Sequence, residues 1–190
     1  MTHGIVLTHG AGSNRNAPLL IAMDREFTAL GWVVERVDLA FRESGRSGPP
    51  RPADQHLDRE GLAQHLRAMR ARVNGKVFLG GHSYGGRQGS ILLASQPELA
   101  DALLLLGYPL HPPGKPAQLR TEHFPSLQVP TLFASGGKDE FGTPEELTAA
   151  VALIPARTER LLFEKLKHDL GGGKGATPSE VAQAFQKFAL

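Results

Sequence analysis

Short apolar runs alternate with longer amphipathic stretches from one end of this chain to the other. Such alternation is typical of βαβ units, which build a mostly parallel sheet with helices packed on both of its faces. Glycines and prolines separate the runs, as expected at element ends. The pattern therefore predicts an α/β fold. The expected strands are 5–8, 32–39, 76–80, 102–106, 129–134 and 160–166, and the expected helices are 18–30, 54–72, 84–95, one from about 144 and one at the end of the chain.

Several helix ends carry recognisable local signals. Gly31 is suited to terminate the first helix, because glycine adopts the left-handed conformation that often follows a helix. Thr143, with Glu146 three residues later, resembles a capping box. At the last helix, Thr177 is the expected N-cap and Pro178 the expected first residue, where its missing N–H costs nothing.

The length and composition fit one globular domain over residues 1–190. With 41% hydrophobic and 21% charged residues, a chain of this length can bury a substantial core but not two independent ones. Segments 42–52 and 108–125 are rich in proline or glycine and are expected to be long loops. Neither is long enough to form a cap domain. We expect a minimal sheet of about six strands without a cap.

Composition excludes several classes of function. The chain has no cysteine, so disulfides, thiolate metal sites and cysteine nucleophiles are ruled out. The start of the chain does not look like a signal peptide, and no apolar stretch suggests a membrane span, so a cytoplasmic protein is expected. The net charge of +2 comes without basic runs, which disfavours nucleic-acid binding. The eight histidines lack zinc-ligand spacing, and no metal or other cofactor is expected.

Ser83 is the candidate nucleophile. It is the centre of the segment Gly81-His82-Ser83-Tyr84-Gly85, which joins a predicted buried strand to a predicted helix. A bare Gly-x-Ser-x-Gly string is weak in a chain with 22 glycines. Between a strand and a helix, however, it predicts a sharp, strained turn that exposes the serine hydroxyl. Gly81 and Gly85 are then required because side chains there would collide. The alternative is an ordinary glycine-rich connection.

A serine nucleophile needs an acid downstream of it, at the carboxyl end of a later strand. Strand 129–134 leads into a turn that contains Asp139 and Glu140. We choose Asp139 as the acid, with Glu140 as its neighbouring competitor. An ordinary turn aspartate is the alternative interpretation.

The base should follow the acid in the chain. His168 comes after the last predicted strand, in a loop that leads to glycines, and fits this order. His111 and His123 are rivals that precede the acid, so they are expected to be surface or pocket-wall residues. His82 is next to the serine and is expected to point elsewhere.

The turn 9–13 follows the first strand and is a candidate oxyanion-binding segment. Two N–H donors must stabilise the tetrahedral oxyanion, and we assign them to Ala11 and Tyr84. The same turn invites a dinucleotide-binding interpretation, with Asp38 as the ribose-binding acid. That fingerprint fails, because its third glycine position holds Arg15.

Taken together, these segments resemble a known family. The chain is similar to small bacterial α/β hydrolases related to dienelactone hydrolase, a group that includes human testis-expressed hydrolase-like proteins. The resemblance rests on segments 7–12, 80–86 and 107–115, on the turn at Asp139 and on the pair His168-Asp169. Dienelactone hydrolase itself uses a cysteine nucleophile, which this chain lacks, and larger relatives begin with two more strands.

The resemblance implies a cofactor-free hydrolase with Ser83, Asp139 and His168 as its triad, while the substrates of the family are largely undefined. Four residues in the resembling segments are expected to contact the substrate. They are His9, Gly10, Tyr108 and His111.

We expect a serine hydrolase that cleaves a carboxyl ester or thioester of a small acyl substrate. The alternative is a non-catalytic interaction module that keeps the fold, since fold alone does not secure activity. Cations in the two long loops would favour an anionic substrate, unless they are simply solvated. These cations are Arg42, Arg46, Arg51, Lys115 and Arg120. The oligomeric state is left open.

Overall fold

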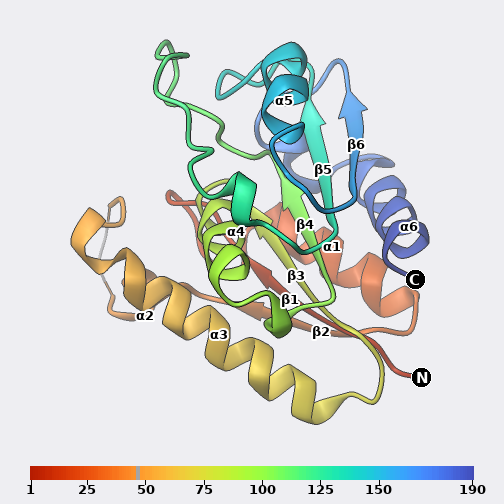
Figure 1. The fold of residues 1–190 in the computed structure, drawn as a ribbon. Coiled ribbons are helices and arrows are strands. Elements are labelled where there is room, and N and C mark those ends of the chain that lie inside the picture. The colour runs from red at the N-terminus through yellow and green to blue at the C-terminus, as the bar shows by residue number, and fades with distance from the viewer. Residues whose placement is uncertain (46–47) are drawn as a thin grey trace.

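The protein is built on a single six-stranded parallel sheet (Figure 1). The computed structural model describes residues 1–45 and 48–190. The strand order is β2-β1-β3-β4-β5-β6, and every neighbouring pair is parallel. The expected sheet of about six strands is therefore confirmed. The strands are β1 (Gly4–Thr8), β2 (Val33–Val37), β3 (Val77–His82), β4 (Ala102–Leu106), β5 (Thr131–Gly136) and β6 (Thr158–Phe163).

Helices connect the strands and cover both faces of the sheet. The α-helices are α1 (Pro18–Ala29), α2 (Ala40–Glu43), α3 (Gln55–Arg72), α4 (Tyr84–Ser95), α5 (Pro144–Val151) and α6 (Thr177–Ala189). Short 3₁₀ helices are η1 (Pro52–Asp54), η2 (Pro97–Leu99), η3 (Phe124–Ser126) and η4 (Leu170–Gly173). Across the described residues, none of the helices has both the length and the apolar character that crossing a bilayer requires.

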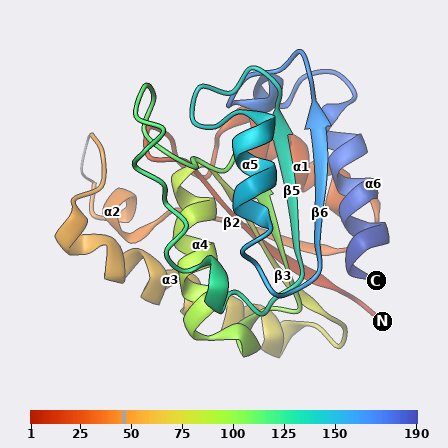
Figure 2. The same cartoon turned by 45° about the horizontal axis from the view of Figure 1, so that its top comes forward.

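The two faces of the sheet bury two separate cores, because successive side chains of a strand point to opposite faces. In β4, Leu104 packs in the core beneath α1 and α6, whereas Leu103 and Leu105 pack in the core beneath α3, α4 and α5. Figures 1 and 2 show these helices on their respective sides of the sheet. All five residues of β4 are buried, which explains its unbroken apolar sequence.

The chain reverses its direction of travel across the sheet between β1 and β3. From β1 it moves to the edge strand β2, then returns past β1 and proceeds outward through β3 to β6. The connection after β1 is α1 on one face, and the connection after β3 is α4 on the other. Such a switch point leaves a crevice at the carboxyl ends of the strands, where ligands bind in open α/β sheets.

The predicted helix ends are partly confirmed. Thr143 and Glu146 form the expected capping box at the start of α5. The N-cap of α6, however, is Ala176 rather than Thr177, and no side chain caps this end, so that prediction was wrong. Because Pro178 fits either of the first two helical positions, its presence does not fix the starting residue.

We predict that Leu104→Ala lowers the free energy of unfolding by about 2–5 kcal/mol, because Leu104 is fully buried and its truncation leaves a cavity. Urea denaturation monitored by circular dichroism measures the change. The matched control is Leu162→Ala on the edge strand β6, whose side chain is 43% exposed. It should cost less than about 1 kcal/mol, and equal losses in the two variants would contradict the assigned core.

Candidate active site

Ser83 occupies a strained turn between β3 and α4. Its backbone angles are φ 51° and ψ −119°, in a region that side chains rarely adopt. Its N–H donates to the carbonyl oxygen of Leu106 at 2.9 Å, which continues the β3–β4 pairing by one residue. In the described part of the chain, Leu170 is the one other non-glycine residue with positive φ. The sharp strand-to-helix turn expected from the sequence is therefore present.

The two motif glycines are required by close backbone contacts. A Cβ atom on Gly81 would lie 2.5 Å from the Cα of Gly86, across the turn. A Cβ atom on Gly85 would lie 2.5 Å from the carbonyl oxygen of His9, at the end of β1. The same carbonyl accepts the Gly85 N–H at 3.1 Å. The expected crowding is confirmed, and at Gly85 it involves the residue that follows β1 rather than the turn itself.

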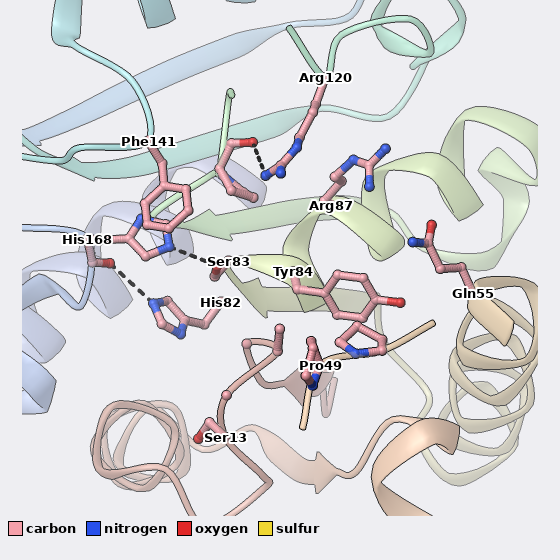
Figure 3. Close-up of a pocket in the computed structure, with 15 residues that line it drawn as sticks. Ser13, Pro49, Gln55, His82, Ser83, Tyr84, Arg87, Arg120, Phe141 and His168 are labelled. Carbon is pink, nitrogen blue, oxygen red and sulfur yellow. Dashed lines mark hydrogen bonds between the residues drawn. The ribbon is translucent and has the colours of Figure 1, made fainter. Parts of the chain in front are cut away.

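Ser83, His168 and Asp139 form one continuous hydrogen-bonded chain (Figure 3). With the proton on Nδ1 of His168, the Ser83 hydroxyl donates to Nε2 at 2.8 Å. Nδ1–H then donates to the Asp139 carboxylate at 2.8 and 3.0 Å. The Asp139 side chain is 3% exposed and that of His168 is 17% exposed. The acid is thus shielded from water, while the base is open to the pocket.

Neighbouring groups hold the acid and the base in place. The Phe141 N–H donates to Asp139 Oδ1 at 2.9 Å, and the Phe141 ring lies 4.1 Å from the imidazole of His168, centroid to centroid. Glu140, the competing acid, is exposed. A Cβ atom on Gly107 would lie 2.5 Å from the His168 carbonyl oxygen, so the loop that carries His168 packs directly on the end of β4.

His82 lies against His168, contrary to the expectation that it points elsewhere. Its Nε2–H donates to the His168 carbonyl oxygen at 3.2 Å, and the two rings are 5.4 Å apart. Burial, followed by the nearby His168, lowers the pKa of His82 to about 4. His82 therefore stays neutral near pH 7 and steadies the loop of the candidate base. Its position next to Ser83 was the one sequence signal for this role.

The rival histidines are occupied elsewhere. His111 is buried, and its ring nitrogens contact the Pro112 carbonyl at 2.8 Å and the Glu146 carboxylate at 3.2 Å. The hydrogen bond to Pro112 is the main cause that raises the pKa of His111. His123 Nε2–H donates to Ser90 Oγ at 2.7 Å, and burial lowers the pKa of His123 to about 4. Both histidines hold loops together.

Of the four expected substrate contacts, the structure brings only Gly10 to the pocket. His9 is fully buried, with Nε2 accepting the Leu39 N–H at 3.1 Å and Nδ1–H donating to the Gly10 carbonyl at 2.8 Å. Tyr108 is buried and its hydroxyl donates to the Arg120 carbonyl at 2.6 Å. With His111 also buried, these three side chains face protein partners, which corrects their expected role as substrate contacts.

The candidate oxyanion turn is tied to α2. Arg42 donates through Nη2 to the Ala11 carbonyl at 3.0 Å and through Nε to the Ser13 carbonyl at 2.9 Å. Ala11 and Tyr84 both line the pocket. Asp38, the acid of the rejected dinucleotide interpretation, accepts the Arg15 N–H at 2.6 Å. It therefore serves the turn itself.

A pocket of about 510 Å³ opens above Ser83 and His168 (Figure 3). Its walls come from both long loops, as expected, through Pro49, Pro50 and Arg120. Arg87, one helical turn after the serine, also lines it and was missed by sequence analysis. The full lining is Gly10, Ala11, Gly12, Ser13, Pro49, Pro50, Gln55, His82, Ser83, Tyr84, Arg87, Pro109, Arg120, Phe141 and His168.

The loop cations divide into different environments. Arg120 lines the pocket, whereas Arg42 is bound to the turn 11–13. Arg51 and Lys115 are exposed. Arg46 lies outside the described residues. Among the described cations of the two loops, Arg120 is therefore the one placed to attract a charged substrate.

The chain belongs to the α/β hydrolase domain family, whose model matches residues 1–188. Solved structures share the fold. An α/β serine hydrolase homologue from Coxiella burnetii is 20% identical with a TM-score of 0.76, covering 95% of this chain and 84% of that one. A putative α/β-superfamily hydrolase from Xanthomonas campestris is 26% identical with a TM-score of 0.69, covering 97% and 98%. The dienelactone hydrolase of Anabaena variabilis is 20% identical with a TM-score of 0.73, covering 98% and 85%.

These comparisons confirm the family and fold that the sequence resembles. Membership of a hydrolase family, together with hydrolases among the structural neighbours, supports a hydrolytic enzyme. The described chain adds no cap to the minimal fold.

We predict that Gly85→Ala destabilises the fold by about 1–3 kcal/mol, because the added methyl group meets backbone atoms of His9, the residue after β1, which cannot move aside. Urea denaturation is the measurement. Gly61→Ala in α3 is the matched control, since its methyl group would meet nothing within 4 Å. That control should be neutral or stabilising by up to about 1 kcal/mol, and a Gly85→Ala variant as stable as the control would contradict the close approach of α4 to β1.

Proposed function

We propose that this protein is a serine hydrolase that cleaves a carboxyl ester or thioester of a small substrate through an acyl-enzyme intermediate. The observation that carries the proposal is the unbroken chain of hydrogen bonds from Ser83 Oγ through His168 to Asp139, on a strained turn that faces a pocket. A serine hydroxyl is a weak nucleophile near neutral pH unless such a base and acid activate it.

In the proposed first half-reaction, His168 Nε2 accepts the Ser83 proton as Oγ attacks the carbonyl carbon of the substrate. Asp139 keeps the imidazole in the correct orientation and stabilises the imidazolium that forms. His168 then gives its proton to the leaving alcohol or thiol. In the second half-reaction, His168 accepts a proton from a water molecule whose oxygen attacks the acyl carbon. The bond from Ser83 Oγ to the acyl group then breaks, His168 returns the proton to Oγ, and the carboxylic acid leaves.

The oxyanion formed in each step is proposed to bind the N–H groups of Ala11 and Tyr84. The Tyr84 N–H lies in the first turn of α4, where no intrahelical acceptor exists and the helix dipole favours negative charge. On the other side, the bonds from Arg42 fix the Ala11 turn before substrate arrives. Fixed donors of this kind stabilise charge that develops in the transition state.

The alternative is a non-catalytic module that retains the hydrolase fold. The strained Ser83 backbone argues against it, because strain of about 1–3 kcal/mol is normally kept where it has a function. The proposed reaction uses only side chains, backbone N–H groups and water, so it requires no cofactor. The cytoplasmic localisation expected from the sequence stays a prediction.

We predict that a fluorophosphonate probe labels Ser83 in the folded protein and fails to label Ser83→Ala, as measured by intact mass and peptide mapping. Hydrolysis of 4-nitrophenyl esters should fall at least ~10³-fold in Ser83→Ala and His168→Ala. In Asp139→Asn it should fall strongly as well, because the imidazole loses its orienting acceptor.

His56→Ala is the matched control, because His56 is exposed on α3 and lies outside the pocket lining. Its activity should equal that of the wild type. Absence of labelling in folded wild-type protein would overturn the hydrolase proposal. Wild-type rates in His168→Ala would overturn the assignment of the base alone.

A further inference from the structure

The pocket lining carries two arginines and, among the residues that the structure describes, no carboxylate. Arg87 comes from α4 and Arg120 from the long loop between β4 and β5. In the view of Figure 3, both side chains lie above Ser83 and Tyr84. Two cations from elements far apart in the sequence therefore converge on a pocket that contains the candidate nucleophile.

Arg87 is fixed at its backbone, and one nitrogen of its side chain has no hydrogen-bond partner in the described chain. Its N–H donates to the Ser83 carbonyl at 3.0 Å, one helical turn back, and its own carbonyl accepts the Ser90 hydroxyl at 2.9 Å. Its Nε is buried without a hydrogen-bond partner in the described chain. A buried N–H donor without an acceptor is unfavourable, so the described contacts leave part of the hydrogen-bonding capacity of the Arg87 guanidinium unused.

Arg120 is held just as firmly. Its N–H donates to the Leu110 carbonyl at 2.8 Å, and its carbonyl accepts the Tyr108 hydroxyl at 2.6 Å. The side chain adds a weak bond from Nη1 to the Pro109 carbonyl at 3.3 Å, drawn in Figure 3. The Nη1 bond restrains the side chain on this anchored backbone, which reduces the conformational freedom that the side chain loses when it binds a ligand.

The two guanidinium groups repel each other. Burial is the main cause that lowers the pKa of Arg120, and the charge of Arg87 is the next. The acid that influences Arg120 is Glu122, which is exposed and forms no ion pair with either arginine in the described chain. An anion placed between the two arginines of the pocket lining would offset this repulsion.

We propose that Arg87 and Arg120 form an anion subsite. This inference rests on the proposed function and deepens it, because the substrate is then an ester or thioester that also carries a carboxylate. A carboxylate matches this pair because guanidinium groups bind its two oxygens through paired hydrogen bonds. Arg87 is one turn of α4, about 6 Å along the helix axis, from Ser83. The carboxylate therefore lies several bonds from the carbonyl that Ser83 attacks, on either the acyl or the alcohol side.

Two pairs of matched esters test the subsite and identify the side. For the acyl side, 4-nitrophenyl hydrogen adipate is compared with neutral 4-nitrophenyl hexanoate. For the alcohol side, 4-carboxyphenyl acetate is compared with its neutral methyl ester. We expect the wild type to prefer the anionic member of one pair by about 10- to 100-fold in kcat/KM, the range of one or two charge-assisted hydrogen bonds.

Arg87→Gln and Arg120→Gln should each reduce this preference about tenfold or more, whereas Arg87→Lys and Arg120→Lys keep part of it. Lys115→Gln is the matched control, because Lys115 is an exposed cation of the same loop as Arg120, and its preference should equal that of the wild type. Because only the ratio between paired substrates is compared, partial misfolding of a variant does not mimic the effect.

A ratio near one for both pairs in the wild type would overturn the subsite, as would a preference that survives both glutamine variants. If a glutamine variant does not fold, inhibition of the wild type by free adipate is compared with inhibition by its dimethyl ester. Stronger inhibition by adipate is expected, and inhibition by the diester alone would overturn the subsite. Failure of the subsite is separable from failure of the proposed function. In the first case Ser83 still reacts with fluorophosphonate and neutral esters are still cleaved, and in the second neither occurs.

Discussion

The close approach of α4 to the end of β1 is the constraint on which the candidate site depends. Gly85 and the His9 carbonyl are joined by a 3.1 Å hydrogen bond in a space where no Cβ atom fits. This contact makes the turn at Ser83 sharp and places the start of α4 beside the turn that follows β1. One close backbone contact at the switch point of the sheet therefore fixes the positions of three groups. They are the strained Ser83, the Tyr84 N–H and the Ala11 turn.

Three histidines have structural roles that differ from the role proposed for His168. His9, His82 and His123 have a pKa lowered mainly by burial, so they remain neutral and use their ring nitrogens to hold turns and loops. His168 keeps Nε2 directed at Ser83. His82, the imidazole next to the candidate base, thus fixes the backbone without adding charge, and Arg87 and Arg120 are the two arginines of the described pocket lining.

The strands, most helices and the proximity of Ser83, Asp139 and His168 could be predicted, because each depends on a local pattern and on the rule that parallel strands end at one edge. The directions of individual side chains could not. His9, Tyr108 and His111 have suitable chemistry, yet tertiary contacts turn all three into the protein. Arg87 had no motif of its own, and only the packing of α4 brings its guanidinium to the pocket.

The pocket lining includes two kinds of segment, turns at strand ends and long loops outside the sheet. The candidate catalytic groups lie in turns that are fixed directly to the ends of central strands, whereas Pro49, Pro50, Pro109 and Arg120 come from segments that run outside the sheet. Loops tolerate insertion and exchange far better than strand ends do. Without a cap domain, the chain can therefore acquire new substrate preferences by changes in these two loops alone, while the hydrogen-bonded groups at the sheet edge stay as they are.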